Sequence, residues 1–205
     1  ARSIWGIWIV MAERLARIDV AFTGDEIPHR ENAILMSNHQ SMADILLIIW
    51  FAWHCGRLGN LKFFVKDEFK YVPGPGWGML FIDCIFVKRN WTQDKVGILA
   101  LFAKFIKHRI PIFLISFLEG TRFTPQKLAG AQEFARNRGL YVPQHTLVPR
   151  TKGFLASVHG LNEHLDAVYD LTIGYPGKTP SLIDCFAIKA PKIHVHIRRF
   201  PLSEM

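Results

Sequence analysis

The sequence predicts a single α/β domain in which helices flank a mixed β-sheet. Short apolar runs alternate along the chain with longer stretches whose apolar residues follow helical spacing. With 205 residues, the chain has the length of one domain and can bury a sizeable core. Half of its residues are hydrophobic, and no internal repeat or low-complexity tract divides them. We therefore expect residues 21–205 to form one folded domain.

The first twenty residues carry a different pattern, that of an amphipathic helix. Apolar side chains recur at helical spacing down one face, at Ile4, Ile7, Trp8, Met11, Leu15 and Ile18. Trp5 lies beside this stripe, and Arg2, Arg14 and Arg17 are available at its rim. Tryptophan and arginine in such places favour a helix that docks on a membrane surface. The alternative is that the stripe packs on the protein's own core.

In the first half of the domain we expect four strands and two helices. Short apolar runs predict the strands, at residues 19–22, 33–36, 62–66 and 85–87. Ser41 is a good cap for an apolar helix from Met42 to about Cys55. A Pro-Gly-Pro-Gly segment at residues 73–76 breaks the chain before a short helix at 77–82.

In the second half, helical spacing at Val96, Leu99, Phe102, Ala103 and Ile106 predicts an amphipathic helix that leads into a strand at 112–117. Thr124 followed by Pro125 is typical of a helix start, and this helix should run toward Gly139. The remaining strands are expected at residues 146–148, 167–173 and 193–197. The last of them alternates apolar and polar residues, so it should have one solvent-facing side.

No apolar run approaches the roughly 20 residues that a membrane-spanning helix needs. The longest, at residues 45–53 and 110–118, have nine residues each. We therefore expect the chain to lie on a membrane rather than cross it as a conventional helix. Its start at Ala1, without a methionine, suggests a trimmed N-terminus and leaves room for a spanning segment before it.

The chain is basic, with a formal net charge of +8 and a pI near 9.6. Its lysines and arginines are dispersed and no nucleic-acid motif accompanies them, which argues against nucleic acid as the partner. Phosphates of phospholipids or of a coenzyme are the more natural anions. The three cysteines lack metal or redox spacing, so we expect reduced core thiols and a site on the cytoplasmic side.

A histidine and a carboxylate five positions apart mark the first candidate site. His39 and Asp44 lie where the strand at 33–36 gives way to a helix. If Ser41 caps that helix, Asp44 takes its third position and can turn back to orient His39 as a general base. The alternative is a capping box, in which Asp44 serves only the start of the helix.

A second polar segment follows the strand at 112–117, with the sequence Glu119-Gly120-Thr121-Arg122. Ligands bind at strand ends of open α/β sheets, and the planar guanidinium of an arginine suits a phosphate. An ordinary surface pair between Glu119 and Arg122 is the alternative.

Together these segments resemble the glycerolipid acyltransferase family, whose members acylate glycerol phosphate and lysophospholipids. His39 and Asp44 resemble its first motif and residues 117–122 its third. Residues 78–89, ending in Lys88-Arg89, resemble the second, and residues 147–150 the fourth. The stretch 168–172 with Gly174-Tyr175-Pro176 further resembles the branch of lysocardiolipin and lysophosphatidic acid acyltransferases and their bacterial relatives.

The resemblance implies a glycerol-3-phosphate acyltransferase-like fold and direct acyl transfer from acyl-CoA or acyl carrier protein to a lysophospholipid. No cofactor or metal is implied; His39 is the base and Asp44 orients it. The implied substrate-binding residues are Lys88, Arg89, Glu119, Gly120, Thr121, Arg122 and Arg150. Since Lys88 and Arg89 are adjacent and strand residues alternate, only one of them should face the site, and we favour Arg89. Glu119 repels phosphate, so it should orient Arg122 or a substrate hydroxyl.

Two other classes of protein remain open. One is a lipid-binding protein that kept the fold without turnover, which the presence of both His39 and Asp44 disfavours. The other is a hydrolase, which would need a Gly-x-Ser-x-Gly elbow or histidines and cysteines spaced as metal ligands. Neither pattern occurs in the sequence.

Overall fold

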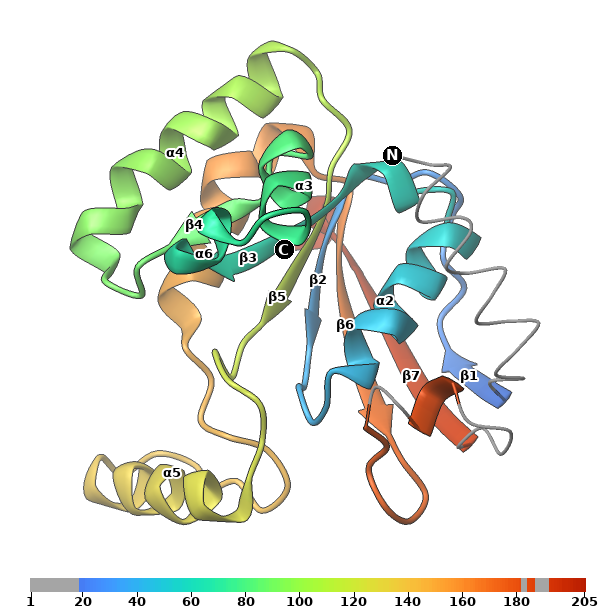
Figure 1. The fold of residues 1–205 in the computed structure, drawn as a ribbon, viewed down its shortest axis with the longest axis vertical. Helices are drawn as coiled ribbons and strands as arrows, with labels where there is room; N and C mark the ends of the chain where they lie inside the picture. Colours follow the sequence, from blue (N-terminus) through green and yellow to red (C-terminus); the bar gives the residue numbers. More distant parts are fainter. Residues whose placement is uncertain (1–18, 182–183, 187–191) are drawn as a thin grey trace.

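A computed structural model describes residues 19–181, 184–186 and 192–205, which contain one seven-stranded sheet flanked by helices (Figure 1). This confirms the predicted α/β class. The amphipathic helix expected at residues 1–20 falls almost wholly outside the described residues. Among the described residues, none of the helices combines the length and apolarity needed to cross a bilayer.

The strand order across the sheet is β1-β7-β6-β2-β5-β3-β4. Their bounds are β1 Asp19–Gly24, β2 Ala33–Ser37, β3 Leu61–Lys66, β4 Ile85–Val87, β5 Phe113–Phe117, β6 Ala167–Gly174 and β7 Lys192–Pro201. Strands β6, β2, β5, β3 and β4 run parallel, whereas β7 is antiparallel to β6 and pairs in parallel with β1. The sheet is therefore mixed, as predicted, with a parallel centre.

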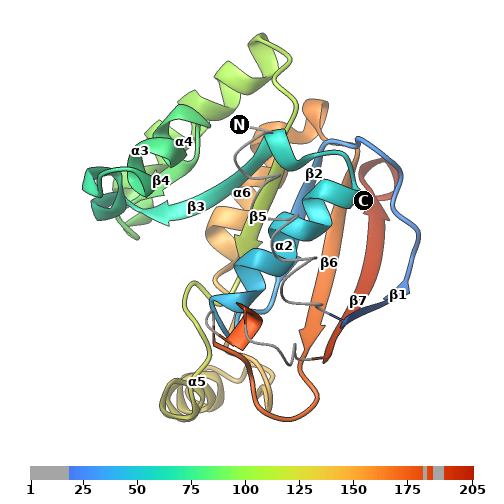
Figure 2. The same cartoon turned by 45° about the vertical axis from the view of Figure 1, so that its right-hand side comes forward.

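Helices cover both faces of this sheet (Figures 1 and 2). The α-helices of the described residues are α2 Ala43–His54, α3 Pro75–Phe81, α4 Trp91–Lys107, α5 Pro125–Asn137 and α6 Thr151–Leu161, and all but α5 pack near the sheet. Alternate residues of β2 enter different cores. Ala33 and Leu35 pack in the cluster that includes α2, while Ile34 packs with α4 and α6. Burial on both faces explains why this strand reads as an unbroken apolar run.

The strand expected at residues 146–148 is wrong, because this segment has no regular secondary structure. Both sides of β5 are already occupied, by β2 and β3, so no sheet edge is free beside it. The segment makes one bond past the end of β5, from the Arg150 N–H to the Leu118 carbonyl at 2.7 Å. Helix α6, which the sequence analysis did not predict, begins immediately afterwards at Thr151.

The carboxyl ends of the five parallel strands share one edge of the sheet. The segments that follow β2, β5 and β4 carry the three polar groups predicted from the sequence, and β6 ends beside β2. Helix α5 lies apart from the sheet, beyond the end to which the β2 and β6 arrowheads point (Figures 1 and 2). Ligand sites of open α/β sheets form at this edge.

Candidate active site

His39 and Asp44 form a hydrogen-bonded pair at the carboxyl end of β2. The Nδ1 atom of His39 lies 2.9 Å from Oδ2 of Asp44, whose side chain is fully buried. Since a carboxylate only accepts, Nδ1 carries the proton. Among the described residues none bonds to the other ring nitrogen, Nε2, which is therefore left as an acceptor.

The capping interpretation of Asp44 holds at the same time. Its Oδ2 also accepts the backbone N–H groups of Gln40 at 2.7 Å and Ser41 at 2.9 Å. The expected helix start is slightly wrong: α2 begins at Ala43 with Met42 as the flanking residue, so Asp44 takes the second helical position. The Ser41 hydroxyl accepts from the Ala43 N–H at 3.1 Å and donates to the Pro180 carbonyl. Helix start and histidine orientation thus depend on the same carboxylate.

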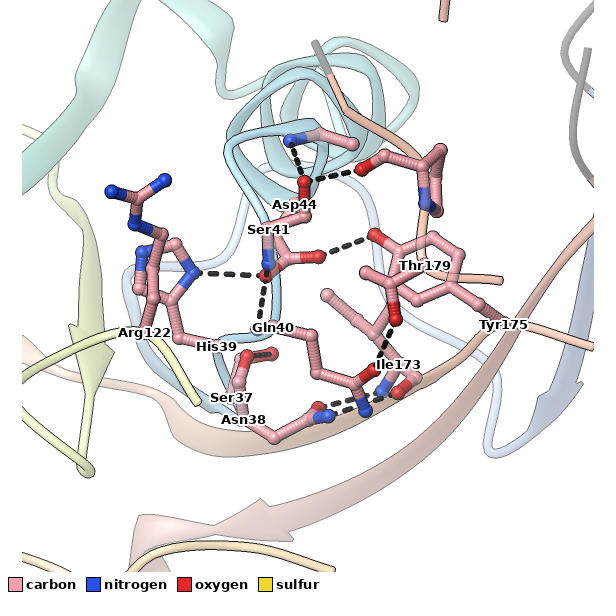
Figure 3. Close-up of polar contacts among 12 residues, drawn as sticks. Ser37, Asn38, His39, Gln40, Ser41, Asp44, Arg122, Ile173, Tyr175 and Thr179 are labelled. Atoms are coloured by element: carbon pink, nitrogen blue, oxygen red, sulfur yellow. Dashed lines mark hydrogen bonds and ion pairs between the residues drawn. The ribbon is translucent and has the colours of Figure 1, made fainter. Parts of the chain in front are cut away.

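Tyr175 is a member of this cluster whose role sequence reasoning missed. It follows β6, and its hydroxyl donates to Oδ1 of Asp44 (Figure 3). Burial and the neighbouring Asp44 carboxylate raise the pKa of Tyr175, which keeps the hydroxyl protonated. Asn38 fixes the β6 end beside β2, since its amide pairs with the N–H and carbonyl of Ile173 at 2.8 and 2.9 Å. The sequence signals were its place at a strand end and within the Gly174-Tyr175-Pro176 stretch that contributed to the family resemblance.

The imidazole of His39 is also held from the β5 side. Its ring stacks on Phe117 with centroids 4.1 Å apart and planes 19° from parallel. The carbonyl of His39 accepts the Phe123 N–H at 2.7 Å. The segment after β5 therefore packs directly against the histidine loop.

Glu119 is buried at this junction rather than lying on the surface. It is 6% exposed, and its Oε2 atom has no hydrogen-bond partner among the described residues. Burial raises its pKa to about 7, although the backbone N–H groups of His39 and Leu147 act in the opposite direction. No ion pair joins Glu119 to Arg122 among the described residues, which excludes the simple surface pair there.

Three cations surround the Gly120 turn. Arg122 is exposed and directly precedes Phe123, whose N–H bonds to the His39 carbonyl. The Cδ of Arg150 lies 3.0 Å from where a Cβ on Gly120 would stand, and Gly120 has a φ of 64°. Both constraints favour glycine there. Lys127, which sequence reasoning missed, donates from Nζ to the Thr121 hydroxyl at 2.7 Å and to the Arg122 carbonyl at 2.9 Å.

Lys88 and Arg89 lie at the same edge but not in the same cluster. They follow β4, which is three strands from β2, or roughly 14 Å at ordinary strand spacing. Both are exposed, and the Asp94 carboxylate accepts the N–H of Lys88 at 2.9 Å. The alternation argument for choosing Arg89 does not apply, because β4 ends at Val87 and Arg89 sits in a turn with a φ of 63°.

The burial of Glu119 predicts a pH dependence of stability. Its pKa is about 7 in the folded protein, against 4.5 as the ordinary value. The stability that protonated Glu119 contributes to the folded protein is therefore fully present below about pH 4.5. It is lost as the pH rises to 7, and the loss is up to roughly 3 kcal/mol. The wild type and Glu119→Gln should be unfolded with urea across this pH range. The free energy of unfolding of the wild type, minus that of the variant, should fall as the pH rises. Parallel curves would contradict the assignment.

Known proteins resemble this chain both in sequence and in fold. Residues 19–174 match the family model described as Acyltransferase. The probable 1-acyl-sn-glycerol-3-phosphate acyltransferase 5 of Arabidopsis thaliana is 33% identical over 200 residues, covering 97% of this chain and 53% of that protein. The human 1-acyl-sn-glycerol-3-phosphate acyltransferase gamma is 31% identical over 210 residues, covering 100% and 56%. The chain spans about half the length of the curated relatives it matches.

Among solved structures, the 1-acyl-sn-glycerophosphate acyltransferase PlsC of Thermotoga maritima has the same fold. The TM-score is 0.56 at 19% identity, and the match covers 100% of this chain and 73% of that one. A second Arabidopsis relative, 1-acyl-sn-glycerol-3-phosphate acyltransferase 3, is 38% identical over 182 residues, covering 88% of this chain and 48% of that protein. From the family model and these relatives, the chain belongs to the acyltransferase family that its four motifs resemble.

Proposed function

We propose that this chain transfers a fatty acyl group from a thioester donor to the free hydroxyl of lysophosphatidic acid or a related lysophospholipid. The observation that carries the proposal is the His39–Asp44 pair, in which the Nε2 atom of His39 is left as an acceptor. The names of the relatives support the same acceptor. The donor is acyl-CoA or acyl carrier protein, and no cofactor takes part.

Direct transfer needs only a base and two substrates held in the correct relative position, because a thioester is already activated. The acceptor hydroxyl attacks the thioester carbonyl carbon and gives its proton to Nε2 of His39. An ester bond forms, the carbon–sulfur bond breaks, and the departing thiolate takes the proton back from the imidazolium. Asp44 stabilises that imidazolium through Nδ1. No covalent acyl-enzyme is required.

Tyr175 acts as a positioning residue in this scheme. Its hydroxyl holds Oδ1 of Asp44 while two backbone N–H groups and His39 share Oδ2. The carboxylate therefore cannot rotate without losing several hydrogen bonds. The imidazole is fixed in turn, which keeps Nε2 aimed at one position.

The acceptor phosphate is proposed to bind at the Gly120 turn. Arg122 precedes Phe123, whose N–H bonds to the His39 carbonyl, and Arg150 packs on Gly120, so two arginines belong to the turn that is bonded to the histidine loop. Glycerol places the phosphate and the reacting hydroxyl only a few bonds apart, so two neighbouring turns can hold both. Glu119 would position a substrate hydroxyl from the buried side, and Lys88 or Arg89 adds positive charge farther along the edge.

The proposal also places the active site at a phospholipid membrane, on its cytoplasmic side. A lysophospholipid resides in a bilayer, so the site must reach the headgroup layer. Cys55, Cys84 and Cys185 are buried free thiols, which is typical of a reducing compartment. Burial also raises the pKa of Cys55 to about 12, so this thiol is unreactive.

The base assignment predicts the outcome of His39→Ala. Acyl transfer should fall by at least about 100-fold, since positioned general bases contribute 10²–10⁴-fold. The fold should survive, because Asp44 would keep its bonds from Gln40, Ser41 and Tyr175. A matched control is His108→Ala, an exposed histidine at the end of α4. More than about a tenth of wild-type turnover in the His39 variant would contradict the assignment of His39 as the base. Absence of turnover in the wild type itself would favour a lipid-binding protein.

The phosphate assignment predicts a split between the two substrates. Arg122→Ala should raise the apparent KM for the lysophospholipid about tenfold or more, the usual cost of a lost charge-assisted hydrogen bond. The apparent KM for the acyl donor should change little. Arg138→Ala, assayed with a short-chain soluble acceptor, is the control, because Arg138 lies at the far end of α5. If the apparent KM values for the lysophospholipid and the acyl donor changed equally, the headgroup would not bind at Arg122.

A further inference from the structure

Residues 122–150 form an arm that leaves the carboxyl end of β5, contains α5 and returns to the start of α6. Figures 1 and 2 both show α5 standing away from the sheet at that edge. We propose that this arm is a docking surface for an anionic phospholipid bilayer. The inference rests on the proposed function, because a lysophospholipid acceptor lies in such a bilayer.

The charge of the arm fits an anionic surface. It contains five basic residues and one acidic residue, Glu133, so it carries half of the net charge of the chain. The basic residues are Arg122, Lys127, Arg136, Arg138 and Arg150. All five are exposed. Basic residues near a membrane surface are attracted by the negative potential of anionic lipids.

Apolar side chains are exposed at the end of the arm. Tyr141 is 85% exposed, Leu140 48% and Phe134 43%. The Arg138 guanidinium lies over the Phe134 ring at 4.5 Å, so cation and aromatic share one surface. Gly139 turns the chain with a φ of 63°, and the Leu140 N–H donates to the Ala135 carbonyl at 2.9 Å. Aromatic residues next to arginine are the composition of a membrane–water interface.

The arm is tied to the active site at its base and folded along its length. Phe123 bonds to the His39 carbonyl, and Lys127 bonds to the Thr121 hydroxyl. Gln132 donates to the Pro143 carbonyl at 3.0 Å, which holds the returning segment against α5. A bilayer that contacts the arm would therefore face the edge of the sheet where His39 lies.

A second exposed apolar patch, on and before α3, lacks the matching charge. Tyr71, Trp77, Leu80 and Phe81 are 45–88% exposed. Residues 66–83, however, carry three acidic residues against two lysines, so this region does not favour an anionic membrane. It supplies a comparator that is at least as apolar as the arm.

The test measures flotation of the purified chain with phosphatidylcholine vesicles, with and without phosphatidylglycerol, at low and high salt. Two double variants alter the arm: Leu140→Ser with Tyr141→Ser, and Arg136→Gln with Arg138→Gln. Two matched variants leave it intact: Leu80→Ser with Phe81→Ser on α3, and Lys95→Gln with Lys107→Gln on α4. Acyl transfer to a short-chain soluble acceptor is measured for every variant.

Both arm variants should bind anionic vesicles about tenfold more weakly, and the arginine pair should lose the preference for phosphatidylglycerol. The α3 and α4 variants should bind within about twofold of the wild type, and all variants should keep soluble-acceptor activity. Wild-type vesicle binding by the arm variants, or its loss in the α3 variant, would overturn the proposal. Loss of acyl transfer to the soluble acceptor in the arm variants would also overturn the proposal. Arm-dependent flotation without acyl transfer by the wild type would refute the proposed function alone.

Discussion

The fully buried carboxylate of Asp44 is the constraint on which the rest of the site depends. A buried charge is costly unless hydrogen bonds replace its hydration. Here His39 and the N–H groups of Gln40 and Ser41 converge on Oδ2, while Tyr175 donates to Oδ1. The same four bonds join the loop after β2, the start of α2 and the end of β6. Removing the whole side chain would therefore loosen three elements at once.

The parallel centre of the sheet makes this convergence possible. Because β2 lies between β5 and β6, the segments that follow these two strands reach the His39 loop from opposite sides. From β5 come Phe117, which stacks on the imidazole, and Glu119, which is buried next to it. From β6 comes Tyr175. Because the strands hold the loops in place, the polar side chains on these loops have well-defined positions.

The sequence was informative where local pattern decides the structure. Apolar runs located the seven strands that the structure describes, and Thr124 caps α5 through its side chain as predicted. The expected strand at 146–148 failed because pairing depends on which sheet edges are free, a property of the whole topology. Helix α6 was missed in the same region. The expectation for residues 1–20 stays a prediction.

Within the site, pairs close in sequence were predictable and long-range partners were not. His39 and Asp44 are five residues apart and meet through one turn, so spacing alone indicated them. Tyr175 reaches Asp44 only because β6 pairs with β2, and Arg150 covers Gly120 only because the arm returns to its origin. No local pattern reports such contacts. The separation of Lys88 and Arg89 from this cluster likewise follows from the place of β4 at the sheet edge.

The most direct test of the central claim is the acyl-transfer rate of Asp44→Asn, measured together with its free energy of unfolding. The carbonyl oxygen of asparagine can still accept the N–H groups of Gln40 and Ser41, so the start of α2 should survive. The charge that is proposed to stabilise the imidazolium is lost, however. We predict a folded protein whose rate is lower by about 100-fold or more. A folded variant with the wild-type rate would show that Asp44 serves only the helix, and would contradict the account.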